Sequence, residues 1–237
     1  WSISTNRALV FQKTSTRSLS SAQATSSCIS GSDDLHLPTT PFYRTMQDLI
    51  NWFQHIQPLS AKAQEALLRH CAVLKLSKGE ILQSIGRTCY TVYFIRKGSA
   101  RIFYYKDGND ITESFAFENS LLARVESLFT GRPSLKGIEM LEDTELIAIS
   151  ALPVFKLYDE FPQIERLARK ITERGYVDTV NRIESLQFHS AEERYRQLLL
   201  EAPDLLKRVP LKHIASYLGI TQVSLSRIRR KVQPVII

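Results

Sequence analysis

The chain has 237 residues, of which 43% are hydrophobic and 23% are charged, a composition typical of a folded globular protein with one or two domains. Its longest apolar runs are far shorter than the roughly 20 residues of a membrane-spanning helix, so the composition excludes a transmembrane protein as well as a disordered one. Cys28, Cys71 and Cys89 are too few and too widely spaced for a disulfide framework or a zinc or iron–sulfur site, which favours a cytoplasmic location.

The formal net charge of +7 is concentrated near the C-terminal end of the chain. Residues 46–161 carry 13 Lys/Arg and 14 Asp/Glu, whereas residues 162–237 carry 14 and 8. A basic excess can indicate that the protein binds nucleic acid or a membrane surface, or it can have no partner at all. The location of the basic residues distinguishes these possibilities. No acidic residue follows Asp204, but seven basic ones do: Lys207, Arg208, Lys212, Arg227, Arg229, Arg230 and Lys231.

Residues 1–45 are rich in Ser and Thr, lack apolar periodicity and begin with Trp1. We interpret them as a disordered or non-native leader, and Met46 as a candidate for the true start of the protein. A transit peptide has a similar composition, and an upstream artefact accounts for it at least equally well.

Residues 46–160 are expected to form the first folded domain. Helical spacing of apolar residues from Met46 to Cys71, broken by Pro58, predicts two short helices up to about Val73. The segment 76–149 then consists of short β-rich runs between glycines, with Asp107-Gly108 as a hairpin signal and Glu142-Asp143 as a solvated hairpin turn. This series predicts an antiparallel β jelly roll, so the fold class is α+β.

Helical periodicity returns in segment 161–189, where Pro162 to Phe188 is long for a surface helix. The pattern leaves two interpretations open: an amphipathic helix lying on the roll, or a dimerisation helix that packs against its copy. Ser190 and Glu193 then form a capping box, which starts a C-terminal all-α domain of residues 190–237.

Residues 210–232 predict a helix-turn-helix. Ala215 is small where two helices approach closely, Gly219 suits a tight turn that needs positive φ, and Leu225 and Ile228 anchor the second helix. Thr221 caps that helix through its hydroxyl group.

Helical geometry turns one face of the second helix outward, and this face suits DNA. Gln matches an adenine edge, Arg matches guanine, and Val contacts a thymine methyl group, while flanking cations neutralise phosphates. An αα-hairpin with a solvated basic face is the alternative, but it does not explain Ala215, Gly219 and Thr221 together. The predicted DNA-binding residues are Thr221, Gln222, Val223, Ser226, Arg227, Arg230 and Lys212.

On these motifs the chain resembles the Crp/Fnr family of bacterial transcription regulators, in the short form common in Bacteroidetes-type bacteria. The resemblance covers residues 46–232 and rests on LSKGEIL at 76–82, TVYFIRKGSARIFYYKDGNDIT at 91–112, segments within 115–150, and ERYRQLLLEAPDLLKRVPLKHIASYLGITQVSLSRIRRKV at 193–232. It implies that residues 46–160 are a cyclic-nucleotide-binding-like sensor domain. It also implies a dimer helix, a C-terminal DNA-binding domain, and RNA polymerase as a further partner.

The chain departs from the cassette with which family members bind cyclic nucleotides. That cassette presents a Gly-Glu pair to the ribose and an arginine to the cyclic phosphate, but this chain has Arg124-Val125 and Ser134-Leu135 there. The missing arginine costs about 2 kcal/mol or more. We therefore expect weak or no cyclic AMP binding and no cofactor, with Glu126 and Arg132 as the candidate ligand-binding residues.

Other chemistries are disfavoured. None of the five histidines lies between residues 77 and 150, which argues against a haem site or a cupin-type metal enzyme, and no nucleophile elbow or phosphate-binding glycine loop is present. The β-hairpin wing that follows the recognition helix in the family is also missing, since only Gln-Pro-Val-Ile-Ile remains.

The sequence therefore predicts a homodimeric, sequence-specific DNA-binding regulator that is not an enzyme, with double-stranded DNA as partner and an effector of unidentified chemistry. The alternative is a regulatory module of the cyclic-nucleotide-binding type that docks a protein and does not bind DNA.

Overall fold

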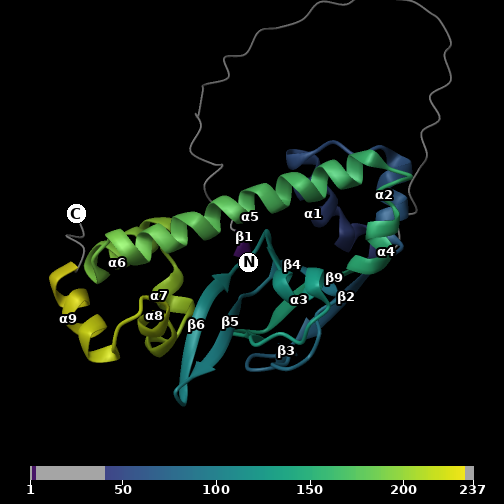
Figure 1. Cartoon of the computed structure of the whole chain (residues 1–237). Coiled ribbons are helices and arrows are strands. Elements are labelled where there is room, and N and C mark those ends of the chain that lie inside the picture. Colours follow the sequence, from purple (N-terminus) through teal and green to yellow (C-terminus); the bar gives the residue numbers. More distant parts are fainter. Residues whose placement is uncertain (1, 4–40, 233–237) are drawn as a thin grey trace, which may run out of the picture.

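The computed structural model describes residues 2–3 and 41–232. Two helices, α1 (Pro41–Ile56) and α2 (Ala61–Leu68), precede a β-sandwich, and the long helix α5 (Pro162–Phe188) connects it to four shorter helices at the other end of the molecule (Figure 1). Most of the leader predicted for residues 1–45 lies outside the described residues, but 41–45 belong to α1, which begins before Met46.

The sandwich consists of two antiparallel sheets. The first has the strand order β1-β7-β4-β9-β2 and the second β3-β8-β5-β6. The expectation of an antiparallel β structure within an α+β fold is therefore confirmed. The strands are β1 (Ser2–Ile3), β2 (Cys71–Leu76), β3 (Ile81–Gln83), β4 (Thr91–Lys97), β5 (Ala100–Lys106), β6 (Asn109–Ala116), β7 (Ser120–Leu122), β8 (Gly137–Met140) and β9 (Thr144–Ser150).

Asp107 and Gly108 form the tight turn between β5 and β6, with Lys106 opposite Asn109, as the sequence predicts. Two other expectations are wrong. Helical spacing extended to Val73, but α2 ends at Leu68, and β2 begins at Cys71 because its backbone pairs with β9. Glu142-Asp143 is not a hairpin turn, since it connects β8 and β9, which lie in different sheets.

Three apolar clusters hold the fold together. One lies between the two sheets and includes Ile95, Ile102 and Leu146. A second packs α1 and α2 against the five-stranded sheet and the first half of α5, where Ile164 is buried. The third joins the C-terminal helices to the sandwich, because it includes Phe115 of β6. The C-terminal helices are therefore docked on the sandwich.

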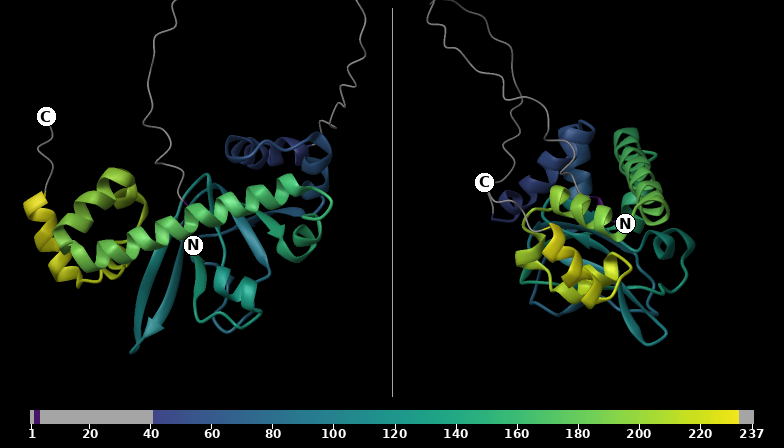
Figure 2. Two further views of the ribbon diagram at one scale, coloured as in Figure 1. Left: turned by 45° about the horizontal axis from the view of Figure 1, so that its top comes forward. Right: turned by 90° about the vertical axis from the view of Figure 1, so that its left-hand side faces the viewer.

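Helix α5 has two different halves. Its first half follows α4 (Ala151–Lys156) and buries Ile164 and Leu167 against the sandwich. Its second half reaches the C-terminal helices (Figure 2) and carries exposed apolar side chains, including Tyr176, Ile183 and Phe188. None of the helices described is both long and apolar enough to span a membrane.

Candidate nucleic-acid interface

The basic C-terminal segment forms two packed helices, α8 (Leu211–Tyr217) and α9 (Gln222–Val232), joined by residues 218–221. Ala215 is buried on the face of α8 toward its neighbours, and Leu225 of α9 is only 1% exposed. Gly219 has φ +69°, the left-handed conformation that a side chain disfavours, and the amide of Ile220 donates to the carbonyl of Ala215 at 3.0 Å. Gly219 therefore has the local role that the sequence predicts, and Ala215 belongs to the buried apolar cluster of the C-terminal helices.

Thr221 caps α9. Its Oγ1 accepts a hydrogen bond from the amide of Ser224 at 3.2 Å, and its carbonyl accepts from the amide of Leu225 at 3.0 Å. One of the free amides at the start of the helix is thereby satisfied by the hydroxyl, which confirms the predicted cap.

One face of α9 is exposed along its whole length. It comprises the outward-facing residues of the sequence prediction, Gln222, Val223, Ser226, Arg227 and Arg230. Val223 is 63% exposed, and Lys212 of α8 is exposed as well. Within residues 41–232, no carboxylate lies within ion-pair distance of any cation of α9. These guanidinium groups therefore keep their hydrogen-bonding capacity for a ligand.

Two arginines that sequence reasoning missed support the turn before α9. Arg182 of α5 lies over the ring of Tyr217, 3.8 Å from its centroid, and donates to the carbonyl of the same residue. Arg194 belongs to α6 (Ala191–Glu201), whose predicted capping box is present, and donates to the carbonyl of Leu218 at 2.8 Å. Both arginines look like solvated helix charges in the sequence, so no local pattern identifies them.

The opposite side of α8 packs on β6. The backbone amide of Thr112 donates to Oγ of Ser216 at 3.1 Å, and the rings of Phe115 and Tyr217 lie 5.2 Å apart. His213 is buried in this contact. Burial, together with nearby Arg101 and Lys212, lowers the pKa of His213 to about 4, so the ring is neutral at neutral pH.

The predicted ligand residues do not form a comparable site. Glu126 lies on α3 (Val125–Thr130) and Arg132 follows it; both are exposed, and neither forms an ion pair within the described residues. Arg124, in contrast, is buried and pairs with Glu113 of β6, with Nη1 3.1 Å from Oε2. Its Nε lies 3.4 Å from Oγ of Ser134, so the two positions of the cassette alignment meet here.

Glu113 also pairs with Lys136. Burial acts to raise the pKa of Glu113, but the hydrogen bond from Lys136 and the charge of Arg124 outweigh it, so the pKa is lowered and the carboxylate stays ionised. Arg124 and Lys136 therefore already have an anionic partner inside the protein. Sequence reasoning missed Glu113 because its partners lie on other elements.

A pocket of about 140 Å³ lies between the first half of α5 and the sandwich. Its lining includes Leu121, Val154 and Ile164, and none of the lining residues is charged. It therefore provides no cationic partner for a phosphate group. Within the described ranges, no cluster of three or more His, Cys, Asp or Glu side chains is arranged to hold a metal ion.

Comparison with known proteins identifies the fold. Residues 73–161 match the cyclic nucleotide-binding domain family. FixK2 from Bradyrhizobium japonicum has a TM-score of 0.59 at 18% identity, over 69% of this chain and 84% of that one. A putative transcriptional regulator of the Crp/Fnr family from Eubacterium rectale has a TM-score of 0.59 at 20% identity, over 74% and 84%.

A third solved structure is the c-di-GMP-responsive regulator CLP from Xanthomonas campestris. Its TM-score is 0.57 at 18% identity, over 73% of this chain and 92% of that one. These structures show the fold that the chain shares with transcription regulators. No curated protein matches the sequence significantly.

Proposed function

We propose that this chain, whose residues 73–161 match the cyclic nucleotide-binding domain family, is a sequence-specific DNA-binding transcription regulator of the Crp/Fnr type. The observation that carries the proposal is the exposed face of α9, whose cations have no ion-pair partner in the described part of the chain. In this proposal α8 and α9 are a helix-turn-helix, and α9 enters the major groove of DNA.

The side chains of α9 divide into two roles. Gln222, Val223, Ser226 and Arg227 face base edges, where an arginine recognises guanine through two hydrogen bonds. Arg230, together with Lys212 of α8, neutralises DNA phosphates. These contacts add affinity without reading the base sequence. Thr221 contacts the DNA backbone near the start of α9, where free amides of the helix favour an anion.

The second half of α5 is the proposed dimer interface. Its Tyr176, Val177 and Ile183 are apolar side chains that the described residues leave exposed. Pairing two copies buries them and presents two α9 helices to successive major grooves, about 34 Å apart on a palindromic site.

Cyclic nucleotides are not the proposed effector. Arg124 and Lys136 already bind the carboxylate of Glu113, so an incoming cyclic phosphate has to displace an internal anion. Ser134 replaces the arginine of the cassette and supplies only a hydroxyl group. The predicted absence of a wing concerns residues 233–237, which lie outside the described residues.

An electrophoretic mobility shift experiment tests the assignment of α9. A palindromic duplex is first selected from a random pool by the parent chain, and the Arg227→Ala variant is then compared with it. Loss of the guanine contact is expected to weaken binding by about 1–3 kcal/mol and to relax selectivity at one base pair of each half-site.

The matched control is Arg87→Ala, which removes the same charge from an exposed position before β4 and should leave selectivity unchanged. If Arg227→Ala binds as tightly and as selectively as the parent, α9 is not the reading helix. If the parent selects no duplex but a protein partner binds with modest salt dependence, the chain is a protein-docking module instead.

A further inference from the structure

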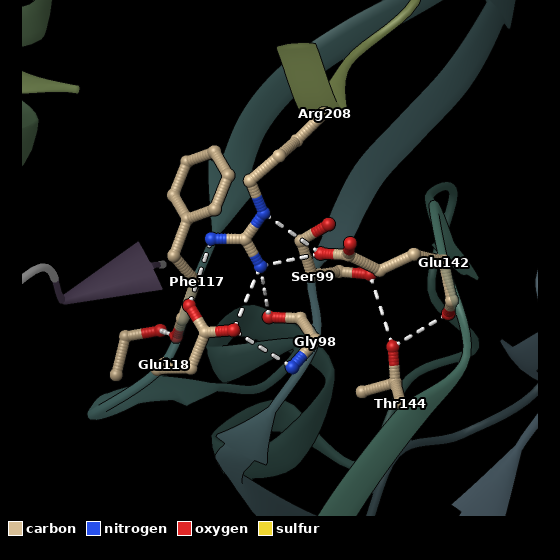
Figure 3. A network of polar contacts seen from close by, with 8 residues as sticks. Gly98, Ser99, Phe117, Glu118, Glu142, Thr144 and Arg208 are labelled. Atoms are coloured by element: carbon tan, nitrogen blue, oxygen red, sulfur yellow. Dashed lines mark hydrogen bonds and ion pairs between the residues drawn. The ribbon is translucent and has the colours of Figure 1, made fainter. Parts of the chain in front are cut away.

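Arg208 contacts the β-sandwich, unlike the cations of α9 (Figure 3). It ends the short helix α7 (Leu205–Arg208). Its Nη2 and Nη1 lie 2.7 and 2.9 Å from the two carboxylate oxygens of Glu118, and its Nε lies 3.0 Å from Oε1 of Glu142. Nη2 also donates to the carbonyl of Gly98 at 3.1 Å, and the guanidinium lies 5.0 Å from the ring centroid of Phe117. The sandwich therefore holds this group by its edges and by one face.

The sandwich supplies these acceptors from three connected loops. The amide of Gly98 donates to Glu118 at 2.9 Å, and Oγ1 of Thr144 donates to the carbonyl of Glu142 at 2.7 Å. Gly98 has φ +100°, and a Cβ at this position would lie 2.5 Å from Oγ1 of Thr144, so only glycine fits. The Gly98 amide thus orients the carboxylate of Glu118, and the Thr144 hydroxyl fixes the backbone of Glu142. Both carboxylates bind the same guanidinium, which offsets their mutual repulsion.

The charge of Glu118 is consistent with this arrangement. Burial acts to raise its pKa, but the hydrogen bond from Arg208, the backbone hydrogen bonds, including that from the Gly98 amide, and the charge of Arg208 together outweigh burial and lower the pKa below the usual value. The carboxylate therefore stays ionised at neutral pH and its contact with Arg208 is charge-assisted and bidentate, the geometry in which arginine binds a carboxylate best.

This contact lies just before the start of α8. Arg208 is followed by the buried Val209 and by Pro210, which immediately precedes α8. Ser216, near the other end of α8, binds the amide of Thr112 on β6. Helix α8 is thus attached to the sandwich at both ends, while the outward face of α9 stays exposed.

We propose that Arg208, Glu118 and Glu142 are positioning residues for DNA reading: they hold α8 and α9 in the orientation in which both halves of a dimer engage a palindrome at once. This inference rests on the proposed function. The three side chains lie away from the outward face of α9, so a single half-site does not require them. Binding to a palindrome does require them. If the helix pair of one subunit changes its orientation, the dimer cannot contact both half-sites at the same time.

The test uses the full chain with Glu118→Gln and Glu142→Gln combined. This variant removes two negative charges, so electrostatics alone would strengthen its binding to DNA. We expect the opposite for a palindromic duplex selected by the parent: affinity falls at least about tenfold, while affinity for the isolated half-site is not weakened. The control combines Glu65→Gln and Glu145→Gln, which break the pairs with Arg69 and Arg96 at sites away from α8.

The control variant should bind the palindrome at least as tightly as the parent does. Palindrome affinity of the Glu118→Gln/Glu142→Gln variant equal to or above that of the control would overturn the proposal. Equal losses on palindrome and half-site would also overturn it, because they indicate general damage to the fold and not a loss of orientation.

Hydrogen exchange of the α8 backbone amides, measured without DNA, separates this proposal from the proposed function. Faster exchange in the Glu118→Gln/Glu142→Gln variant than in the control supports the contact, and unchanged exchange contradicts it. If the parent binds no DNA, the proposed function fails and the role in reading DNA fails with it, whereas the exchange result still decides whether these residues hold α8.

Discussion

Arginines in the β-sandwich and on α9 have the same chemistry and opposite surroundings. Arg101 is 3% exposed and pairs with Asp110 and Glu139. Arg227 and Arg230 are exposed, and no carboxylate of the described residues pairs with them. A buried, paired guanidinium maintains the fold because its desolvation is already compensated, whereas an exposed and unpaired one is available to phosphates and bases. The net charge of +7 therefore becomes informative only when the cations are sorted by their partners.

The largest expected effect comes from removing a partner inside the sandwich. Glu113→Gln leaves the buried Arg124 without its counter-charge, and we expect the free energy of unfolding to fall by about 3 kcal/mol. Urea denaturation measures it. The control Glu65→Gln breaks an exposed pair with Arg69 and should cost less than about 1 kcal/mol. Equal effects of the two variants would mean that burial does not distinguish these pairs.

The buried contact of α8 should also respond to pH. The folded chain keeps His213 neutral down to a pKa of about 4, whereas the unfolded chain protonates it near the ordinary value of 6.5. Protons thus bind preferentially to the unfolded state between these values, and stability is lost as the pH falls through this window. We expect about 2 kcal/mol of loss between pH 7 and pH 5.

Urea denaturation at the two pH values measures this loss, and His213→Leu should reduce it. Asp110, which interacts electrostatically with His213, has a pKa lowered by Arg101 despite its partial burial. The stability that its carboxylate contributes is therefore lost only as the pH falls below the ordinary value of 3.8, outside the range from pH 7 to pH 5. A parent chain equally stable at pH 5 and pH 7 would contradict the burial of a neutral His213.

The exposed half of α5 is predicted to hold a dimer together. Ile183→Glu places a charge in the proposed interface, and we expect the dimer to dissociate at least about tenfold more readily, because burying an unpaired carboxylate is unfavourable. Light scattering over a concentration series measures the mass. Glu184→Gln, one residue along the same helix, is the control, and a parent chain that is monomeric at all concentrations would refute the interface.

The smallest expected effect concerns a cation that contacts phosphate only. Lys212→Ala should weaken DNA binding nearly uniformly across sequences and reduce the slope of log K against log salt by about 1. Fluorescence anisotropy over a salt series measures the slope. A sequence-dependent loss would instead assign Lys212 to base recognition.

Local patterns identified the parts of the site that are contiguous in sequence. Ala215, Gly219 and Thr221 lie within one turn and its flanking helices. The structure gives Gly219 the expected positive φ and Thr221 the expected capping hydrogen bond. Arg208 and Glu118 are 90 residues apart, and both look like ordinary surface charges in the sequence. Their contact depends on how the C-terminal helices dock on the sandwich, which no periodicity encodes. For the same reason, the sequence does not reveal the ion pair between Glu113 and Arg124.

The salt dependence of DNA binding tests the central claim most directly. The full chain is titrated onto a palindromic duplex selected from a random pool, and onto a scrambled duplex of equal length, at several salt concentrations. We predict tight binding to the palindrome, weaker binding to the scrambled duplex, and a steep loss of affinity for both as salt rises. Equal affinity for the two duplexes, or no binding to either at low salt, would contradict the account.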